Sequence, residues 1–134
     1  MAENLMKLEV TTPERIFYDD DVKMVELTTT EGDVGILPQH IPTTMIVAPG
    51  ILTITEKDGQ KKEAGLMSGF IEITKTKVSI LAEVAEWPGD IDPQRAARAK
   101  ERAERRLQSH ETGVDMQRAE LALRRSLVRR KLKK

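Results

Sequence analysis

The stretch GDIDPQRAARAKERAERRLQ, residues 89–108, marks the point where the character of the chain changes. Asp92 is a favourable cap for the start of a helix. Pro93 suits the first helical position, where its missing N–H has no partner to lose. Alanine and arginine dominate the residues after Pro93, and neither glycine nor proline recurs before Gly113. The stretch therefore predicts a helix that begins at Pro93.

A second helix is predicted after SHETGVD, residues 109–115, where Thr112 and Asp115 have the spacing of a capping pair. Two helices with a brief connection predict an antiparallel hairpin. Alanine contacts bury little area, at roughly 25 cal/mol per Å² of apolar surface. We therefore expect a weakly packed hairpin that can open. The apolar positions of its second helix are Met116, Ala119, Leu121, Ala122, Leu123, Leu127 and Val128.

The chain before this stretch predicts β structure. EGDVG (31–35) indicates a turn, and Asp58-Gly59 is a strong hairpin signal. Many short strands without an intervening helix predict a small sandwich or barrel. We expect a β-sandwich domain over residues 1–86 and a helical hairpin over 87–134, a mainly β plus α fold. The apolar positions of the predicted strands are Val25, Leu27, Leu52, Ile54, Ile71, Ile73, Val78, Ile80, Ala82 and Val84.

Charge divides at the same place. Residues 1–86 carry eight Lys/Arg and fifteen Asp/Glu, so their balance is 8 − 15 = −7. Residues 87–134 carry fourteen and seven, so their balance is 14 − 7 = +7, and the chain as a whole is neutral. The segment Trp87-Pro88-Gly89 lies between them and predicts a hinge.

Composition excludes several classes of protein. The chain has no cysteine, which rules out disulfides and cysteine-based zinc sites. No apolar run reaches the roughly 20 residues that span a bilayer, and the N-terminus does not have the pattern of a secretory signal. The expectation is a soluble, intracellular protein without direct membrane insertion. Aromatic residues make up 3% of the chain, so the core must be aliphatic.

The sequence shows no pattern for conventional catalysis or for a metal site. Phosphate-loop, zinc-protease and nucleophile-elbow motifs are absent, and His40 and His110 fall in different units. Arg95 and Arg102 share one helical face, as do Arg125 and Arg129. In an antiparallel hairpin these four guanidinium groups could converge on a polyphosphate. The alternative is a solvated basic face, and spacing alone leaves both open.

Four segments, taken in order, make the chain resemble the epsilon subunit of F-type ATP synthases. They are EGDVGILPQHIP (31–42), SGFIEI (68–73), VSILAE (78–83) and IDPQRA (91–96), the last matching an I/L-D-x-x-R-A motif. The likeness runs almost from end to end. Gln39 stands where the family usually has glycine, and Met67-Ser68-Gly69 replaces a common Gly-Gly pair, so local turns should differ.

The resemblance implies a non-catalytic subunit of the central stalk, peripheral to the cytoplasmic face of the cell membrane. Its β-sandwich would contact the gamma subunit and the c-ring, with Asp33 facing the c-ring and His40 near gamma. Its hairpin would either fold against the sandwich or extend into the catalytic head, where it restrains ATP hydrolysis. Charge complementarity favours an acidic surface on the catalytic beta subunit as the partner of the basic hairpin.

In some bacterial members the folded hairpin binds ATP as a regulatory ligand. The resemblance implies that Glu86 accepts from the adenine amino group and that the arginines take the phosphates. The chain offers no carboxylate cluster for magnesium and no base to position water, so ATP should be sensed and not hydrolysed. The residues that match the family's site are Glu86, Ile91, Asp92, Arg95, Ala96, Arg102, Arg125 and Arg129.

Two other functions stay open at this point. A basic helical tail on a small β domain is typical of a nucleic-acid-binding module, although the acidic β unit and the scarcity of aromatics for base stacking argue against it. A free-standing nucleotide sensor with no assembly partner is the other. Co-purification with gamma would exclude the sensor, and tight, sequence-dependent nucleic-acid binding at physiological salt would favour the module.

Overall fold

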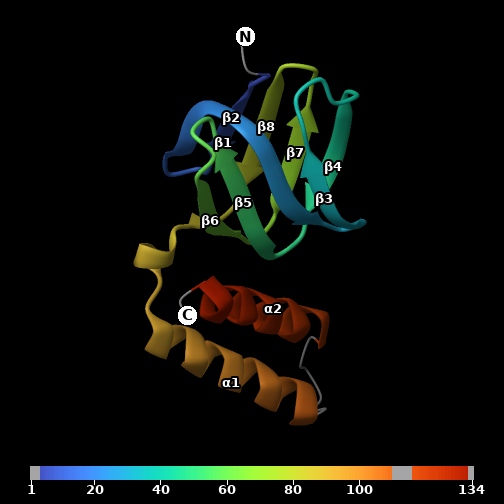
Figure 1. Cartoon of the computed structure of the whole chain (residues 1–134). Helices are drawn as coiled ribbons and strands as arrows, with labels where there is room; N and C mark the ends of the chain where they lie inside the picture. Colours follow the sequence, from blue (N-terminus) through green and yellow to red (C-terminus); the bar gives the residue numbers. More distant parts are fainter. Residues whose placement is uncertain (1–3, 110–115, 133–134) are drawn as a thin grey trace.

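The computed structural model describes residues 4–109 and 116–132, which form a β-sandwich and a two-helix hairpin packed beside it (Figure 1). The mainly β plus α fold predicted from the sequence is confirmed. The strands are β1 (Met6–Thr11), β2 (Ile16–Thr29), β3 (Gly32–Ile36), β4 (Thr43–Val47), β5 (Gly50–Glu56), β6 (Lys61–Leu66), β7 (Gly69–Ile73), β8 (Lys77–Ala82) and β9 (Ala85–Glu86). A 3-10 turn, η1 (Pro88–Asp90), leads to α1 (Pro93–Ser109) and α2 (Met116–Leu132).

The strands follow the order β1-β8-β7-β4-β2-β5-β6-β9, and β2 also pairs with β1 and β3. β2 is long because it belongs to both layers. Its first half pairs with β1 and its second half with β3 and β5. The inner face of the sandwich is aliphatic as expected, and its fully buried side chains include Leu8, Val10, Val22, Val25, Ile36, Leu52, Ile54, Leu66, Ile71, Ile73, Val78 and Ile80.

Two local predictions for the β unit were wrong. EGDVG was expected to be a turn, but Gly32 starts β3, which pairs with β2 over Val25–Thr29. The turn is confined to Thr30 and Glu31 because pairing with a distant strand outweighs the turn preference of the glycines. Val84 was expected to be an apolar position of the last strand, on the same side as Val78, Ile80 and Ala82, but β8 ends at Ala82 and the Val84 side chain is exposed.

The start of α1 confirms the predicted cap. The Asp92 carboxylate accepts hydrogen bonds from the N–H groups of Gln94, at 2.9 Å, and Arg95, at 3.2 Å. Pro93 is the first helical residue. The capping pair predicted at Thr112 and Asp115 lies outside the described residues, and so does the break of the first helix after Ser109.

The hairpin packs through small side chains. α2 lies between α1 and the sandwich, and it contacts β5 and β6 (Figure 1). In the described part of the hairpin, the buried side chains from Pro93 onward are Ala96, Ala103, Ala119 and Ser126. Leu121 and Leu127 are exposed. The helices therefore approach closely but bury little apolar area, as predicted, and we expect the docking to be weak.

The predicted hinge is partly fixed to the sandwich. The Trp87 ring stacks on Phe17 with 4.3 Å between ring centroids, and Tyr18 meets it edge-on. Burial and, after it, a hydrogen bond to Glu56 raise the pKa of Tyr18 above its ordinary value. The hydroxyl therefore stays protonated and donates a hydrogen bond to Oε2 of Glu56 at 3.0 Å. Trp87 thus packs with the sandwich core, and η1 separates it from α1.

Gln39 adopts a left-handed backbone conformation with φ of 71°. A side chain is disfavoured there by roughly 1–2 kcal/mol, whereas glycine loses about 0.5–1 kcal/mol through its greater freedom in the unfolded chain. Gln39→Gly should therefore raise the free energy of unfolding by about 0.5 kcal/mol in a denaturant titration. Gln60→Gly is the control, since Gln60 has a negative φ and its replacement should lower stability. A lower stability for both variants would contradict the prediction.

Candidate functional site

A cavity of about 350 Å³ lies where the end of the sandwich, the start of α1 and the last turns of α2 meet. This volume is in the range that holds a small-molecule ligand. The cavity is open to solvent, and its walls come from the continuous stretch 86–102 and from Arg129 of α2. The residues that line it are Glu86, Asp90, Ile91, Asp92, Arg95, Ala96, Ala99, Arg102 and Arg129.

Seven of the eight residues proposed from the sequence line this cavity, and Arg125 does not. Arg125 is half-buried on α2, one helical turn before Arg129, a separation of about 6 Å along the axis. The predicted convergence of four guanidinium groups is therefore a convergence of Arg95, Arg102 and Arg129 in this structure. Sequence reasoning did not include Asp90 and Ala99.

One face of α1 forms the arginine wall of the cavity. Arg95, Ala99 and Arg102 recur at intervals of four and three, so they lie on the same side of the helix. The small side chain of Ala99 leaves the space between the two arginines open, and the spacing itself could have identified it. Within the described residues, neither Arg95 nor Arg102 makes an ion pair or a side-chain hydrogen bond.

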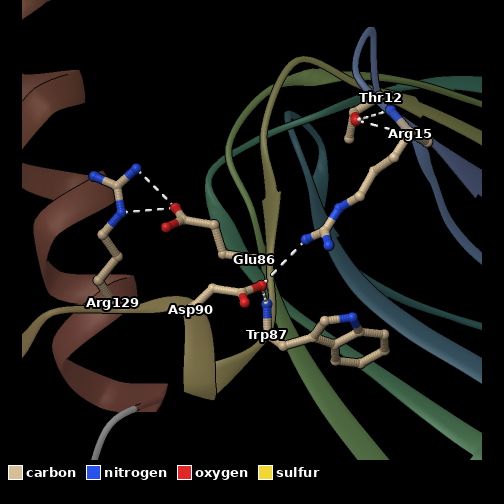
Figure 2. Close-up of polar contacts among 6 residues, drawn as sticks. All are labelled: Thr12, Arg15, Glu86, Trp87, Asp90 and Arg129. Atoms are coloured by element: carbon tan, nitrogen blue, oxygen red, sulfur yellow. Dashed lines mark hydrogen bonds and ion pairs between the residues drawn. The ribbon is translucent and has the colours of Figure 1, made fainter.

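The opposite wall carries an ion pair between the sandwich and α2. The Arg129 Nε and Nη2 atoms both lie 2.8 Å from Oε1 of Glu86, the last residue of β9 (Figure 2). The side chains of Arg129 and Glu86 are 27% and 19% exposed, so water screens them less than a surface pair. Glu86, which the resemblance assigns to the adenine amino group, is bound to an arginine in this structure.

Asp90 holds the floor of the cavity against the β1–β2 turn. Its Oδ2 atom accepts from the Trp87 N–H at 3.0 Å and from Arg15 Nη2 at 3.2 Å (Figure 2). The Arg15 guanidinium also lies over the Phe17 ring, 5.2 Å from its centroid, and the Thr12 hydroxyl orders the turn that carries Arg15. These contacts place η1, and therefore the start of α1, relative to the sandwich.

The charged groups of the cavity could bind an anion. Three arginines and three carboxylates line the cavity. Glu86 pairs with Arg129, Asp90 pairs with Arg15, and Asp92 caps α1, so Arg95 and Arg102 are the cations left for an anionic ligand. Guanidinium pairs with phosphate oxygens through two parallel hydrogen bonds. In the residues that the structure describes, no group of three or more His, Cys, Asp or Glu side chains could hold a metal ion.

The two predicted partner residues lie outside this cavity. Asp33 is exposed on β3, and its Oδ1 accepts from the Thr28 hydroxyl at 2.7 Å. It lines a larger cavity of about 520 Å³ between α2 and strands β2, β3 and β5, which contains Lys131 but no arginine. His40 follows β3, and its Nδ1 lies 2.6 Å from the Ile41 carbonyl oxygen.

An exposed apolar row crosses one face of the sandwich and was not predicted. Ile46 of β4 pairs with Phe70 of β7, and Phe70 pairs with Leu81 of β8. Leu81 pairs in turn with Thr11, which pairs with Ile16. Ile16, Ile46, Phe70 and Leu81 are all exposed. Large apolar side chains gathered on a sheet face are typical of an interaction surface.

The two parts of the chain each match a family model. Residues 5–88 match "ATP synthase, Delta/Epsilon chain, beta-sandwich domain". Residues 90–134 match "ATP synthase, Delta/Epsilon chain, long alpha-helix domain". The two matches meet in the η1 segment that lines the cavity.

Curated relatives resemble the chain over nearly its whole length. It is 49% identical over 126 residues to the "ATP synthase epsilon chain" of Caldanaerobacter subterraneus, covering 93% of this chain and 91% of that one. It is 43% identical over 124 residues to the "ATP synthase epsilon chain" of Bacillus velezensis, covering 92% and 93%.

Solved structures extend the likeness to three dimensions. A chain of the Euglena gracilis mitochondrial ATP synthase, in a structure of its OSCP, F1 and c-ring, matches with a TM-score of 0.83 and 28% identity, over 93% of this chain and 79% of that one. A chain from the Tetrahymena thermophila central stalk and c-ring matches with a TM-score of 0.62 and 14% identity, which shows the fold alone. Among the residues described, neither helix has the length and apolar character that crossing a membrane requires.

Proposed function

Because this chain belongs to the family of ATP synthase delta and epsilon chains, we propose that it restrains ATP hydrolysis by the synthase through the hairpin of α1 and α2. It is the epsilon type of subunit, by its identity to bacterial epsilon chains over more than nine-tenths of its length. The observation that supports regulation is the cavity of Arg95, Arg102 and Arg129, which joins both helices to the sandwich. A ligand bound there would favour the folded hairpin.

The sandwich is the part that would seat the subunit in the stalk. The exposed row of Ile16, Ile46, Phe70 and Leu81 would offer an apolar face to the gamma subunit. His40, in the segment between β3 and β4, would lie near gamma as the resemblance implies. Asp33, on the exposed β2–β3 hairpin, would face the c-ring. In this arrangement the subunit is peripheral to the cytoplasmic face of the membrane and contributes no catalytic group.

The hairpin is suited to leave the sandwich. Its contacts are made by small side chains, so only a little buried apolar surface becomes exposed to water when α2 leaves the sandwich. The released helices would present Arg124, Arg130 and Lys131, which are exposed on α2, to an acidic surface of the catalytic beta subunit. Extension would block hydrolysis, and folding would permit it.

ATP would act as the regulatory ligand of the folded state. Arg95 and Arg102 would take the phosphates, and the ligand would stabilise the folded hairpin by RT ln(1 + [L]/Kd), about 2.7 kcal/mol at a hundredfold excess over Kd. High ATP would keep the hairpin docked, and low ATP would release it. With no base to position water, bound ATP would be sensed and not consumed.

Arg102→Ala tests this proposal directly. Calorimetric titration of the full chain with ATP, with and without magnesium, should give about tenfold weaker binding, because one charge-assisted contact to phosphate is lost. Arg105→Ala is the matched control, since Arg105 lies on the same helix and does not line the cavity. If wild type shows neither heat nor a higher melting temperature at millimolar ATP, the arginines are a solvated face and the nucleotide role fails.

A further inference from the structure

Two residues of the proposed nucleotide site are bound to each other in this structure. Glu86 and Arg129 both line the cavity, and they form its one half-buried ion pair among the described residues. We propose that Glu86 is a built-in counter-ion of this site, which holds Arg129 while the cavity is empty and gives it up when a polyphosphate enters. The inference rests on the proposed nucleotide function and adds a competitor within the protein itself.

Glu86 and a phosphate would compete for one edge of the Arg129 guanidinium. Arg129 uses Nε and Nη2, the two donors of one guanidinium edge, on a single oxygen of Glu86 (Figure 2). The same edge would present two parallel N–H groups to a phosphate. Arg129 therefore cannot give this edge to both partners. Arg95 and Arg102, which carry no ion pair within the described chain, are available to a phosphate at once.

Exchange leaves Glu86 without its cation. Its side chain is 19% exposed, and removal of one member of a shielded pair leaves a charge that water solvates poorly. A ligand that carries only negative charge would leave Glu86 poorly solvated and would also repel its carboxylate. A ligand that brings both a polyanion and an N–H donor would pair with Arg129 and with Glu86. The ion pair thus favours a ligand with two kinds of group over a simple polyanion.

The same pair fastens the hairpin before any ligand arrives. Glu86 ends β9 in the sandwich and Arg129 lies in the last turns of α2, so the contact spans the surface where the two parts dock. Loss of the pair without a replacement would loosen docking. A ligand that replaces both contacts would keep α2 in place.

Binding of inorganic tripolyphosphate to Glu86→Gln tests the proposal. Glutamine keeps the shape of the side chain but removes the competing charge. Calorimetry of the full chain should therefore show about tenfold tighter tripolyphosphate binding than in wild type. Glu120→Gln is the matched control: it removes the same charge from an exposed pair with Arg124, away from the cavity, and should leave binding unchanged. Adding Arg129→Gln to Glu86→Gln should abolish the gain, because the gain acts through Arg129.

ATP binding separates this inference from the function on which it rests. ATP should bind wild type, and Glu86→Gln should narrow the difference in affinity between ATP and tripolyphosphate. If wild type binds ATP but Glu86→Gln leaves tripolyphosphate binding unchanged, the counter-ion role is wrong and the nucleotide site stands. If Glu86→Gln binds tripolyphosphate more tightly but wild type does not bind ATP, Glu86 is a counter-ion of Arg129 and the nucleotide role fails. If wild type does not bind ATP and Glu86→Gln does not bind tripolyphosphate more tightly, the nucleotide site and the counter-ion role are both wrong. Circular dichroism of each variant confirms that it is folded.

Discussion

Alanine at Gly69 is expected to lower the free energy of unfolding of the sandwich by on the order of 4 kcal/mol, a large share of the roughly 5–15 kcal/mol by which a domain is typically stable. Gly69 begins β7 with φ of 144°, a conformation that side chains rarely adopt. A Cβ there would collide with the Leu81 carbonyl oxygen and lie 2.8 Å from the Ala82 Cα. Both obstacles are backbone atoms of the paired strand β8, so neither can move without breaking the pairing.

Chemical denaturation followed by far-UV circular dichroism measures this loss. Gly59→Ala is the matched control, because Gly59 also has a positive φ, of 88°, but nothing lies within 4 Å of the added Cβ. The free energy of unfolding of that variant should fall only by the cost of placing a side chain at positive φ, about 1 kcal/mol. Equal losses for the two variants would mean that the close approach of β8 to Gly69 has no energetic consequence.

Valine at Gly65 is expected to push the hairpin off the sandwich. Gly65 lies on β6 under α2, and an added Cβ would come 2.9 Å from Leu132 Cδ1 and 3.4 Å from Val128 Cγ1 of α2. It would also come 3.3 Å from Met67 Cε, the far end of a flexible side chain that can shift. The larger valine overfills this contact at a cost of about 2 kcal/mol, roughly 30-fold in the docking equilibrium. The cost falls on docking because α2 can leave, whereas β6 is fixed between β5 and β9.

Amide hydrogen exchange should show faster exchange in α2 and unchanged protection in β5 and β6. Gly65→Ala should give a smaller change of the same kind, and Gly89→Ala, where the added Cβ meets nothing within 4 Å, should give none. Under the proposed regulation, a synthase assembled with Gly65→Val should hydrolyse ATP more slowly than wild type. Unchanged protection of α2 in Gly65→Val would show that Gly65 does not limit docking.

Sequence reasoning succeeded where the cause is local. The cap at Asp92 depends only on residues 92–95, and the face shared by Arg95 and Arg102 depends only on helical periodicity. The hairpin at Asp58-Gly59 was likewise correct, since β5 and β6 flank it. The resemblance to epsilon subunits is confirmed by the family match over both parts of the chain.

Prediction from sequence failed for features that depend on contact with residues far along the chain. β3 was taken for a turn because nothing near EGDVG indicates pairing with Val25–Thr29. The apolar row needs the register of four strand pairs, which no short pattern gives. The ion pair of Glu86 with Arg129 joins residues 43 positions apart, and Arg125 was grouped with Arg129 because periodicity does not tell which turn of α2 meets the cavity.

The long strand β2 has a mechanical consequence. It runs from Ile16, at one end of the apolar row, to Thr29, beside the Asp33 hairpin. Its fourteen residues, at about 3.3 Å each, are hydrogen-bonded to β1 in one half and to β3 and β5 in the other. The two layers therefore cannot slide past one another without tearing this ladder. A load applied at the apolar row would reach the Asp33 hairpin through covalent chain, so under the proposed function the sandwich would pass torque on as a stiff coupling.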